Sequence, residues 1–255
     1  MSDRIVIIGN GISGVTAARN IRKKSNCPVT IISKESEYFF SRTALMYIYM
    51  GHMRFQDTQP YEPHFWKKNK IDLVFDEVKS IDYSAQKLSL AHSEDIEYSS
   101  LVLAVGSVPN VFPWPGVEAI GVQGLYSKQD LESLEQRSDK IKSAVIVGGG
   151  LIGIELAEML LTRNIKVDFL VREDLFWSGV LPEADANFVG EHLKKHHGLT
   201  MRYGSEMEEV QKNEEGEVKA VTLKSGEILP CQFVGLTVGV RPNVDFLKEG
   251  DLEID

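Results

Sequence analysis

The stretch "IVIIGNGISGVTAARNIRKK", Ile5–Lys24, joins a short apolar run, three closely spaced glycines and a helical pattern without a break. The β-branched run Ile5–Ile8 predicts a buried parallel strand, and Val15–Lys24 predicts a helix. The next apolar run, Val29–Ile32, predicts a second strand and completes a βαβ unit. This order of strand, glycine turn, helix and strand is typical of a nucleotide-binding fold.

The glycines of this turn have the spacing Gly9-x-Gly11-x-x-Gly14. The first glycine permits a tight turn, the second lets the backbone approach a pyrophosphate, and the third allows close packing of helix and strand. The start of the helix adds free N–H groups and a partial positive charge. Glu35 follows Gly14 by 21 residues, near the position of the acid that binds a ribose. The turn therefore predicts a dinucleotide site.

A second copy of this layout runs through "AVIVGGGLIGIELAEMLLTR", Ala144–Arg163, with the spacing Gly148-x-Gly150-x-x-Gly153. The elements predicted around it are a strand over Ala144–Val147, a helix over Ile152–Arg163 and a strand over Lys166–Val171. The chain therefore carries the nucleotide-binding pattern twice.

The second copy lacks the ribose-binding acid at its usual place, where Val171 stands. Arg172 follows, and an arginine there can hold the 2′-phosphate of NADPH through its planar fork. Glu173 and Asp174 come directly after it and would repel a phosphate, and a shift of register would make Glu173 the ribose ligand of NADH. A third interpretation makes Arg172 a solvated surface charge. The pattern favours NADPH and leaves the other two open.

The rest of the chain predicts further elements of an α/β fold. These are Ile71–Phe75 and Ser80–Leu90 as strands of a small sheet, Leu101–Val105 as a buried strand, Glu183–His197 as a helix, Met207–Leu223 as a hairpin that turns at "NEEGE", and Phe233–Val238 as a strand. The stretch "GSVPNVFPWPGVE" is rich in proline and glycine and predicts a crossing between domains.

The composition is that of a soluble globular enzyme, since 43% of the 255 residues are hydrophobic and 25% are charged. The formal net charge of -9 disfavours nucleic acid and anionic membranes as partners. No apolar run reaches the roughly 18 residues of a membrane span. The start "MSDRIVIIGN" goes directly into a predicted strand, so we expect no signal peptide. Two cysteines, Cys27 and Cys231, lie far apart in the sequence, so we expect a cytoplasmic protein without disulfides.

One pair of histidines has a spacing that suits a metal. His192 and His196 are four residues apart in a predicted helix. No third ligand is evident and two lysines lie between them, so a solvated helix end is the favoured interpretation. We predict no metal site.

The two glycine units, the crossing "LVLAVGSVPN" between them and "TVGVRPN" near the end resemble the pyridine nucleotide–disulfide oxidoreductase superfamily. The resemblance implies that the first unit binds FAD and the second binds NAD(P)H. It implies an α/β fold of two Rossmann-like three-layer nucleotide-binding domains, the second inserted into the first. The expected domains are residues 1–112 for the first part of the FAD-binding domain, 113–234 for the NAD(P)-binding domain and 235–255 for the return to the FAD-binding domain.

Within that superfamily, "TIISKESEYFFSRTALMYIYMG" is similar to the rubredoxin, ferredoxin and nitrite reductase-type branch. On this resemblance Glu35 holds the FAD ribose and Arg42 lies near the flavin phosphates. Val78 lies where the backbone meets the adenine, while Ala104 and Gly106 form the turn where the chain crosses over the cofactor. Other residues expected to contact the cofactors are Ile12, Ser13, Leu151, Ile152 and Gly239.

The resemblance also supplies a catalytic candidate. Glu155, in "GLIGIELAE", matches an acid near the flavin–nicotinamide stack. Ferredoxin reductase-like members often pair this acid with a lysine, but here those positions hold Met46 and Tyr47. The redox disulfide is missing as well, because neither Cys27 nor Cys231 lies in the loop after the first unit. We therefore expect electrons to leave the flavin for an external acceptor, such as a small iron protein or a metal centre.

Members of the superfamily continue beyond "GVRPN" with a strand, a Gly-Asp pair that contacts FAD and a C-terminal interface domain. This chain stops at Asp255, and Gly250-Asp251 is not that pair because no predicted strand precedes it. We expect a shortened reductase. The alternatives are a fragment, a form completed by a partner chain or a homodimer, and a non-catalytic dinucleotide-binding module.

Overall fold

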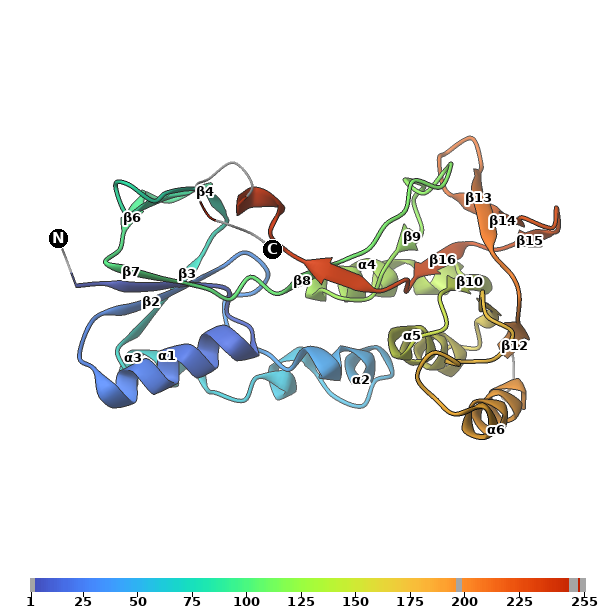
Figure 1. Ribbon diagram of the computed structural model, residues 1–255, viewed down its shortest axis with the longest axis horizontal. Helices are drawn as coiled ribbons and strands as arrows, with labels where there is room; N and C mark the ends of the chain where they lie inside the picture. The colour runs from blue at the N-terminus through green and yellow to red at the C-terminus, as the bar shows by residue number, and fades with distance from the viewer. Residues whose placement is uncertain (1–2, 196–198, 248–251, 253–255) are drawn as a thin grey trace. The chain divides into compact units, whose positions relative to one another are not determined.

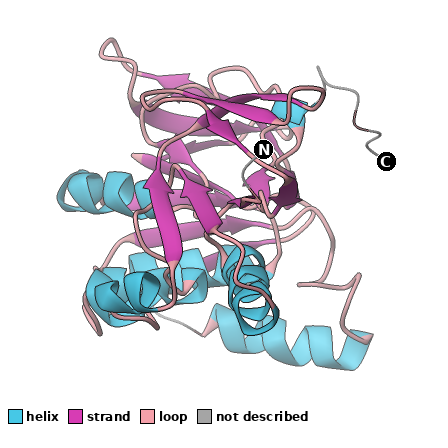
Figure 2. Cartoon of the chain, turned by 90° about the vertical axis from the view of Figure 1, so that its left-hand side faces the viewer, coloured by secondary structure: helices cyan, strands magenta, loops and turns pink. Residues whose placement is uncertain are grey.

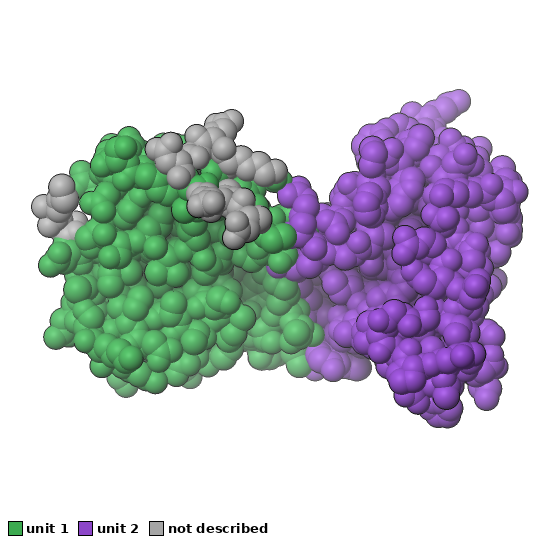
Figure 3. Space-filling view, viewed as in Figure 1, with its two compact units in different colours: residues 1–44, 53–108, 242–255 green, residues 45–52, 109–241 purple. Residues whose placement is uncertain are grey.

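The computed structural model describes residues 3–195, 199–247 and 252. The chain divides into two compact units, which Figure 3 shows in different colours. The first unit consists of Met1–Ala44, Met53–Val108 and Pro242–Asp255, and the second of Leu45–His52 and Pro109–Arg241. The sequence pattern did not predict that the short segment Leu45–His52 packs with the second unit.

The first unit contains a parallel sheet with the strand order β3-β2-β1-β7 (Figure 1). Its strands are β1 (Ile5–Ile8), β2 (Val29–Ser33), β3 (Ile71–Phe75) and β7 (Ser100–Leu103). Helix α1 (Ile12–Lys24) connects β1 to β2 and begins three residues earlier than the sequence predicts. The predicted βαβ unit is confirmed.

One predicted pairing is wrong. Ile71–Phe75 was expected in a small sheet with Ser80–Leu90, but it pairs in parallel with β2. Helix α3 (Pro63–Lys68), which the sequence analysis did not predict, precedes β3 and lies in the long crossover that a parallel pair requires. A six-residue helix shows too little periodicity to reveal such a crossover.

A second sheet lies on one face of the parallel sheet. It is antiparallel and contains β4 (Val78–Asp82), β5 (Lys87–Leu90) and β6 (Ile96–Glu97). Its core joins residues of both sheets, namely Val6, Ile8, Ile32, Leu88, Leu90 and Tyr98. The opposite core joins the parallel sheet to the helices and includes Ile7, Val15, Ala18, Val29, Trp66 and Ile71. The first unit therefore has three layers.

The second unit repeats this plan. Its parallel sheet has the order β12-β11-β10-β16-β9. The strands are β9 (Val122–Gln123), β10 (Ser143–Val147), β11 (Lys166–Leu170), β12 (Leu199–Arg202) and β16 (Phe233–Leu236). The helices are α4 (Lys128–Arg137), α5 (Leu151–Thr162) and α6 (Glu183–Lys194), and Figure 2 distinguishes them from the strands by colour. Predicted residues His196 and His197 of the last helix lie outside the described residues.

The third layer of the second unit is the antiparallel sheet of β13 (Met207–Lys212), β14 (Val218–Leu223) and β15 (Ile228–Pro230). The predicted hairpin is thus confirmed, with its turn in the expected place. The core between the two sheets contains Val145, Val147, Leu170, Val210, Val221, Leu229, Val234 and Leu236. The α/β class and the two Rossmann-like three-layer units are confirmed, while the cofactor assigned to each predicted domain stays a prediction.

Short elements complete the chain. They are the 3₁₀ helices η1 (Arg42–Ala44), η2 (Phe55–Thr58), η3 (Ser138–Lys140) and η4 (Asp245–Leu247), and the two-stranded sheet of β8 (Ser107–Pro109) and β17 (Val240–Pro242). Among the described residues, none of the helices has the length and apolar character that crossing a membrane requires.

Helix α2 (Leu45–Tyr49) is held within the second unit by the buried side chain of Tyr49. The Tyr49 hydroxyl lies 2.7 Å from the hydroxyl of Ser138. The Arg163 guanidinium lies 3.8 Å from the Tyr49 ring centroid and donates a 2.8 Å hydrogen bond to the Tyr49 carbonyl. Arg163 also pairs with Glu135 at 3.2 Å. We call Tyr49, Ser138, Arg163 and Glu135 the α2 anchor.

Candidate dinucleotide-binding sites

The first glycine turn follows β1, and each glycine in it has a distinct structural reason. Gly9 has φ +110°, and a Cβ there would lie 2.1 Å from the carbonyl oxygen of Ala104. A Cβ on Gly14 would lie 2.0 Å from the Gly9 carbonyl and 3.2 Å from Ile7, so the missing side chain lets α1 pack closely on β1. A Cβ on Gly11 would meet nothing within 4 Å, so this glycine leaves space for a ligand to approach the backbone.

The second glycine turn follows β10 and shows the same three reasons. Gly148 has φ +115°, and a Cβ there would lie 2.5 Å from the carbonyl oxygen of Thr237. A Cβ on Gly153 would lie 2.7 Å from the Gly148 carbonyl and 2.8 Å from the Phe169 ring. A Cβ on Gly150 would meet nothing within 4 Å. The predicted structural roles of the first and third glycines are therefore present in both units, while the approach of a pyrophosphate to the second glycine stays a prediction.

Both turns lie at a topological switch point, where the chain connects from a central strand to neighbours on opposite sides of it. β1 has β2 on one side and β7 on the other, and β10 has β11 on one side and β16 on the other. Ligands of open α/β sheets bind at the carboxyl ends of strands at such switch points. Gly11 and Gly150 are the N-caps of α1 and α5, and neither helix has a side-chain cap or an acid in its first turn. The backbone N–H groups there can donate hydrogen bonds to an anion.

The first helical residues of both turns are unusually exposed for their type. Ile12 is 69% exposed and Leu151 is 57% exposed. Ser13 is also exposed and Ile152 is half-buried. Ile12 and Ser13 thus begin the helix of the first turn, and Leu151 and Ile152 begin that of the second. Their contact with a nucleotide stays a prediction.

Glu35 and Arg42 form a bidentate ion pair in the first unit. The guanidinium Nη1 donates to Oε1 of Glu35 at 2.8 Å, and Nη2 donates to Oε2 at 2.5 Å. Glu35 follows β2, and its side chain is 20% exposed. The sequence analysis gave the two residues separate roles, whereas the structure brings them together. The pairing fixes the carboxylate two residues after the end of β2.

The remaining predicted residues of the first unit lie in two places. Ala104 directly follows β7, donates from its N–H to the Ile8 carbonyl at 2.8 Å and presents its own carbonyl to Gly9. Gly106 has φ +67° and lies just beyond it. Val78 begins β4, three residues after the end of β3, and packs against the core between the two sheets.

Gly239, the last predicted residue of "TVGVRPN", lies in the second unit. It has φ +91°, and its carbonyl accepts a 3.0 Å hydrogen bond from the Asn110 N–H. Thr237, two residues earlier, was missed by the sequence analysis. Its hydroxyl donates to the carbonyls of Val147 and Gly148 at 3.0 and 3.1 Å, so it fixes the backbone of the glycine turn. The signal in the sequence that could have indicated Thr237 is its position near the end of the last predicted buried strand.

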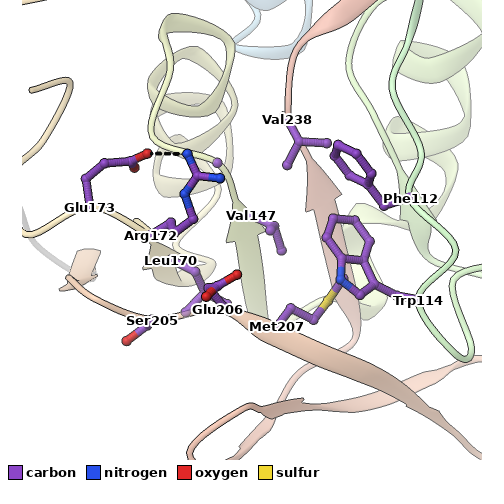
Figure 4. Close-up of a pocket in the computed structure, with 11 residues that line it drawn as sticks. Phe112, Trp114, Val147, Leu170, Arg172, Glu173, Ser205, Glu206, Met207 and Val238 are labelled. Carbon is purple, nitrogen blue, oxygen red and sulfur yellow. Dashed lines mark hydrogen bonds and ion pairs between the residues drawn. The ribbon is translucent and has the colours of Figure 1, made fainter. Parts of the chain in front are cut away.

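A pocket of about 260 Å³ opens beside the second glycine turn (Figure 4). The backbone of Gly148 contributes to its lining. One part of the wall is apolar and contains Phe112, Trp114, Met207 and Val238. Another part is polar and contains Arg172, Glu173, Ser205 and Glu206. The sequence analysis singled out Arg172 and weighed Glu173, but it missed the other side chains because they come from segments remote in sequence.

Val171, which stands where a ribose-binding acid is usual, does not line the pocket. Its side chain is fully buried, and a Cβ on Gly149 would lie 3.1 Å from it. Arg172 and Glu173 are the next residues, and they reach the pocket as an ion pair of 2.8 Å. The Arg172 side chain is 73% exposed, so it both lines the pocket and contacts solvent.

Glu155 lies in the second turn of α5 and is half-buried. Burial raises the pKa of its carboxyl group, and the negative charge of Glu158 raises it further. Met46 and Tyr47, at the positions where the resemblance led us to look for a lysine, lie in α2, which packs against α5. The ring of Tyr47 stacks on that of His52 at a centroid distance of 6.1 Å.

Neither cysteine lies in a glycine turn. Cys231 is fully buried, and burial raises the pKa of its thiol to about 12, which disfavours the thiolate. Cys27 is half-buried beside the C-terminus of α1. Within the described ranges, no cluster of three or more His, Cys, Asp or Glu side chains could hold a metal, and His196 lies outside those ranges.

Two parallel sheets, each with a three-glycine turn at its switch point, define the class of proteins with paired dinucleotide-binding units. The chain belongs to the pyridine nucleotide-disulphide oxidoreductase family, which matches it over residues 3–255. This result agrees with the resemblance drawn from the two turns and the crossing segments.

Similar proteins include reductases of several kinds. Nitrite reductase (NAD(P)H) of Bacillus subtilis (strain 168) is 26% identical over 99% of this chain and 31% of its own length. Rubredoxin-NAD(+) reductase of Pseudomonas putida is 26% identical over 98% of this chain and 65% of its own length. The chain thus spans less than two thirds of these relatives.

The fold is also similar to a solved structure. The ferredoxin reductase for the CYP199A2 system from Rhodopseudomonas palustris matches with a TM-score of 0.90 and 27% identity. The match covers 99% of this chain and 63% of that protein. Nearly the whole chain is therefore similar in fold to a part of this ferredoxin reductase.

Proposed function

We propose that this chain is the nucleotide-binding part of a flavoprotein oxidoreductase that passes a hydride from NAD(P)H to FAD and then electrons to an external acceptor. The observation that carries the proposal is the duplicated turn. In both units, the first glycine meets a carbonyl, the second faces open space and the third lets helix and strand pack closely. A pair of such turns suits a pair of dinucleotides.

The first turn fits the FAD pyrophosphate and ribose. Gly11 leaves room for phosphate oxygens beside the free N–H groups of α1. Glu35 presents a carboxylate near the end of β2, where a ribose hydroxyl can donate to it. Arg42 holds that carboxylate, and its guanidinium is the cation of this site that a phosphate would approach.

The second turn fits NAD(P)H. Gly150 leaves the same opening at the start of α5, and the adjoining pocket of about 260 Å³ combines apolar walls with charged groups. Phe112 and Trp114 supply flat surfaces against which an adenine ring can pack. Glu155 is a candidate for tuning the charge near the reacting rings, because it is half-buried and burial raises the pKa of its carboxyl group.

Bound FAD accepts a hydride and can release electrons one at a time. The residues of this chain bind and orient the nucleotides and exclude water. A thiol relay is not part of the proposal, because Cys231 is buried with a raised pKa and Cys27 lies at the far end of α1. The relatives named for rubredoxin and ferredoxin support a small iron protein as acceptor, with a metal centre as the alternative.

The proposal is tested by anaerobic absorption spectroscopy of the purified protein with FAD added. NADH or NADPH should bleach the flavin band, and a small iron protein or ferricyanide should restore it. Mass measurement of the native protein would show whether a homodimer or a partner chain accompanies the activity. Binding of both nucleotides without bleaching would support a non-catalytic dinucleotide-binding module instead, and failure to bind either would contradict both proposals.

A further inference from the structure

The pocket beside the second glycine turn has a polar wall built by two segments. One segment follows β11 and supplies Arg172 and Glu173, and the other follows β12 and supplies Ser205 and Glu206 (Figure 4). Backbone hydrogen bonds join the segments. The Ser205 N–H donates to the Val171 carbonyl at 3.1 Å, and the Gly204 N–H donates to the Glu173 carbonyl at 3.2 Å. The two acids therefore stand on backbone that is fixed.

Arg172 is already engaged by a carboxylate. Its Nη2 donates to Oε1 of Glu173 at 2.8 Å. The pKa of Arg172 is raised, first by the hydrogen bond and charge of Glu173 and then by the charge of Glu206. A phosphate that approached this guanidinium would therefore approach two carboxylates as well.

Glu206 is held in place from outside the pocket. Lys224 pairs with its Oε2 at 2.9 Å, and Lys224 is not among the residues that line the pocket. The charged side chains of the lining are thus one arginine against two glutamates. A ribose diol can donate hydrogen bonds to carboxylates, whereas a dianionic 2′-phosphate is repelled by them.

We infer that Glu173 and Glu206 make this pocket select NADH over NADPH, with the two carboxylates facing the adenosine ribose. The inference rests on the proposed function of the second unit. It assigns the ribose contact to Glu173 and to an acid from the next strand end, in place of an acid at Val171. It also departs from the expectation that Arg172 holds a 2′-phosphate.

The test compares 5′-AMP with adenosine 2′,5′-bisphosphate (2′,5′-ADP), which differ only in the 2′-phosphate. Dissociation constants are measured on the full chain by calorimetry and by the fluorescence of tryptophan, since Trp114 lines the pocket. The unmodified protein should bind 5′-AMP at least about tenfold more tightly than 2′,5′-ADP. Glu206→Gln and Glu173→Gln should each narrow that ratio by roughly three- to tenfold.

Glu215→Gln is the matched control variant. Glu215 is exposed in the β13–β14 turn, so this substitution removes the same charge from a position outside the pocket. Tighter binding of 2′,5′-ADP to the unmodified protein, lost in Arg172→Gln, would overturn the inference and leave the proposed function intact. Failure of both nucleotides to bind would instead count against the proposed function. Equal ratios in Glu206→Gln, Glu173→Gln and Glu215→Gln would also overturn the inference.

Discussion

Gly9 illustrates how one residue fixes the geometry of a nucleotide turn. A side chain is disfavoured here for two reasons: the φ of +110°, and the 2.1 Å distance that would separate a Cβ from the Ala104 carbonyl oxygen. Gly9→Ala should lower the free energy of unfolding by about 3 kcal/mol, because both the backbone conformation and the close contact oppose it. Urea denaturation of the two proteins measures this difference.

Gly216→Ala separates the effect of the backbone conformation from the effect of the close contact. Gly216 also has a positive φ, +76°, but a Cβ there would meet nothing within 4 Å. This variant should cost only about 1 kcal/mol, from the backbone conformation alone. Equal losses in Gly9→Ala and Gly216→Ala would show that the contact with Ala104 does not matter.

Asp76 gives the first unit a pH-dependent stability. A hydrogen bond from the Ser93 side chain and backbone N–H groups of Glu77, His92 and Ser93 lower the pKa of its carboxyl to about 2. In the unfolded chain the carboxyl has its ordinary pKa of 3.8, so the folded state binds the proton less tightly than the unfolded chain does. The stabilisation is present above pH 4 and is lost as the pH falls from 3.8 towards 2.

Asp76→Asn should lower the melting temperature clearly at pH 6, where the ionised carboxylate accepts these hydrogen bonds, and much less at pH 2.5. Melting curves at both pH values measure the difference. Asp72→Asn, an exposed site in β3, serves as the matched variant and should change little at either pH. A loss from Asp76→Asn that is the same at pH 6 and pH 2.5 would refute the assignment.

At the scale of elements, the α2 anchor explains how a five-residue helix is held in the second unit. Isolated helices of this length do not persist in water, so tertiary contacts must hold α2. Arg163→Met removes the hydrogen bond to the Tyr49 carbonyl, the contact with the Tyr49 ring and the pair with Glu135. The free energy of unfolding should fall by about 2 kcal/mol.

Tyr49→Phe should cost about 1 kcal/mol, because it removes only the hydrogen bond with Ser138. Lys166→Met, at an exposed position of β11, is the control for Arg163→Met. Both comparisons use chemical denaturation. A loss in Lys166→Met as large as that in Arg163→Met would show that the anchor contributes no more than an ordinary surface charge.

The same elements show how far sequence reasoning reaches. The strands around both turns were predicted because buried β-branched runs and glycine spacing are local signals. The parallel pairing of β3 and the docking of α2 were not predicted, because both depend on contacts between segments distant in sequence. The pairing of Glu35 with Arg42, the role of Thr237 and the contribution of Glu206 to the pocket were missed for the same reason.

At the scale of the whole molecule, the chain contains one architecture twice. Each unit has helices, a parallel sheet and an antiparallel sheet, and each carries its turn at the same topological position. The units differ in the charged residues that follow the second strand of each βαβ unit. Glu35 follows β2 in the first unit, whereas Arg172 and Glu173 follow β11 in the second. Each unit is therefore expected to bind its own nucleotide independently of the other turn.

Gly11→Leu and Gly150→Leu test this independence. A Cβ at either position meets nothing within 4 Å, so the first atom of an added side chain is tolerated, and a leucine there is expected to extend into the space proposed for the pyrophosphate. Gly11→Leu should weaken FAD binding by about a hundredfold and leave the binding of NADH or 5′-ADP unchanged. Gly150→Leu should have the opposite pattern, as measured by flavin fluorescence and calorimetry.

Gly179→Leu is the control, because Gly179 is also open to solvent but lies outside both turns. It should bind both nucleotides like the unmodified protein, which excludes a general effect of an added leucine. If Gly11→Leu weakened both nucleotides equally, the two turns would not be separate sites. If neither leucine at Gly11 nor at Gly150 changed any affinity, the open space at the second glycine of each turn would not be where the dinucleotides bind.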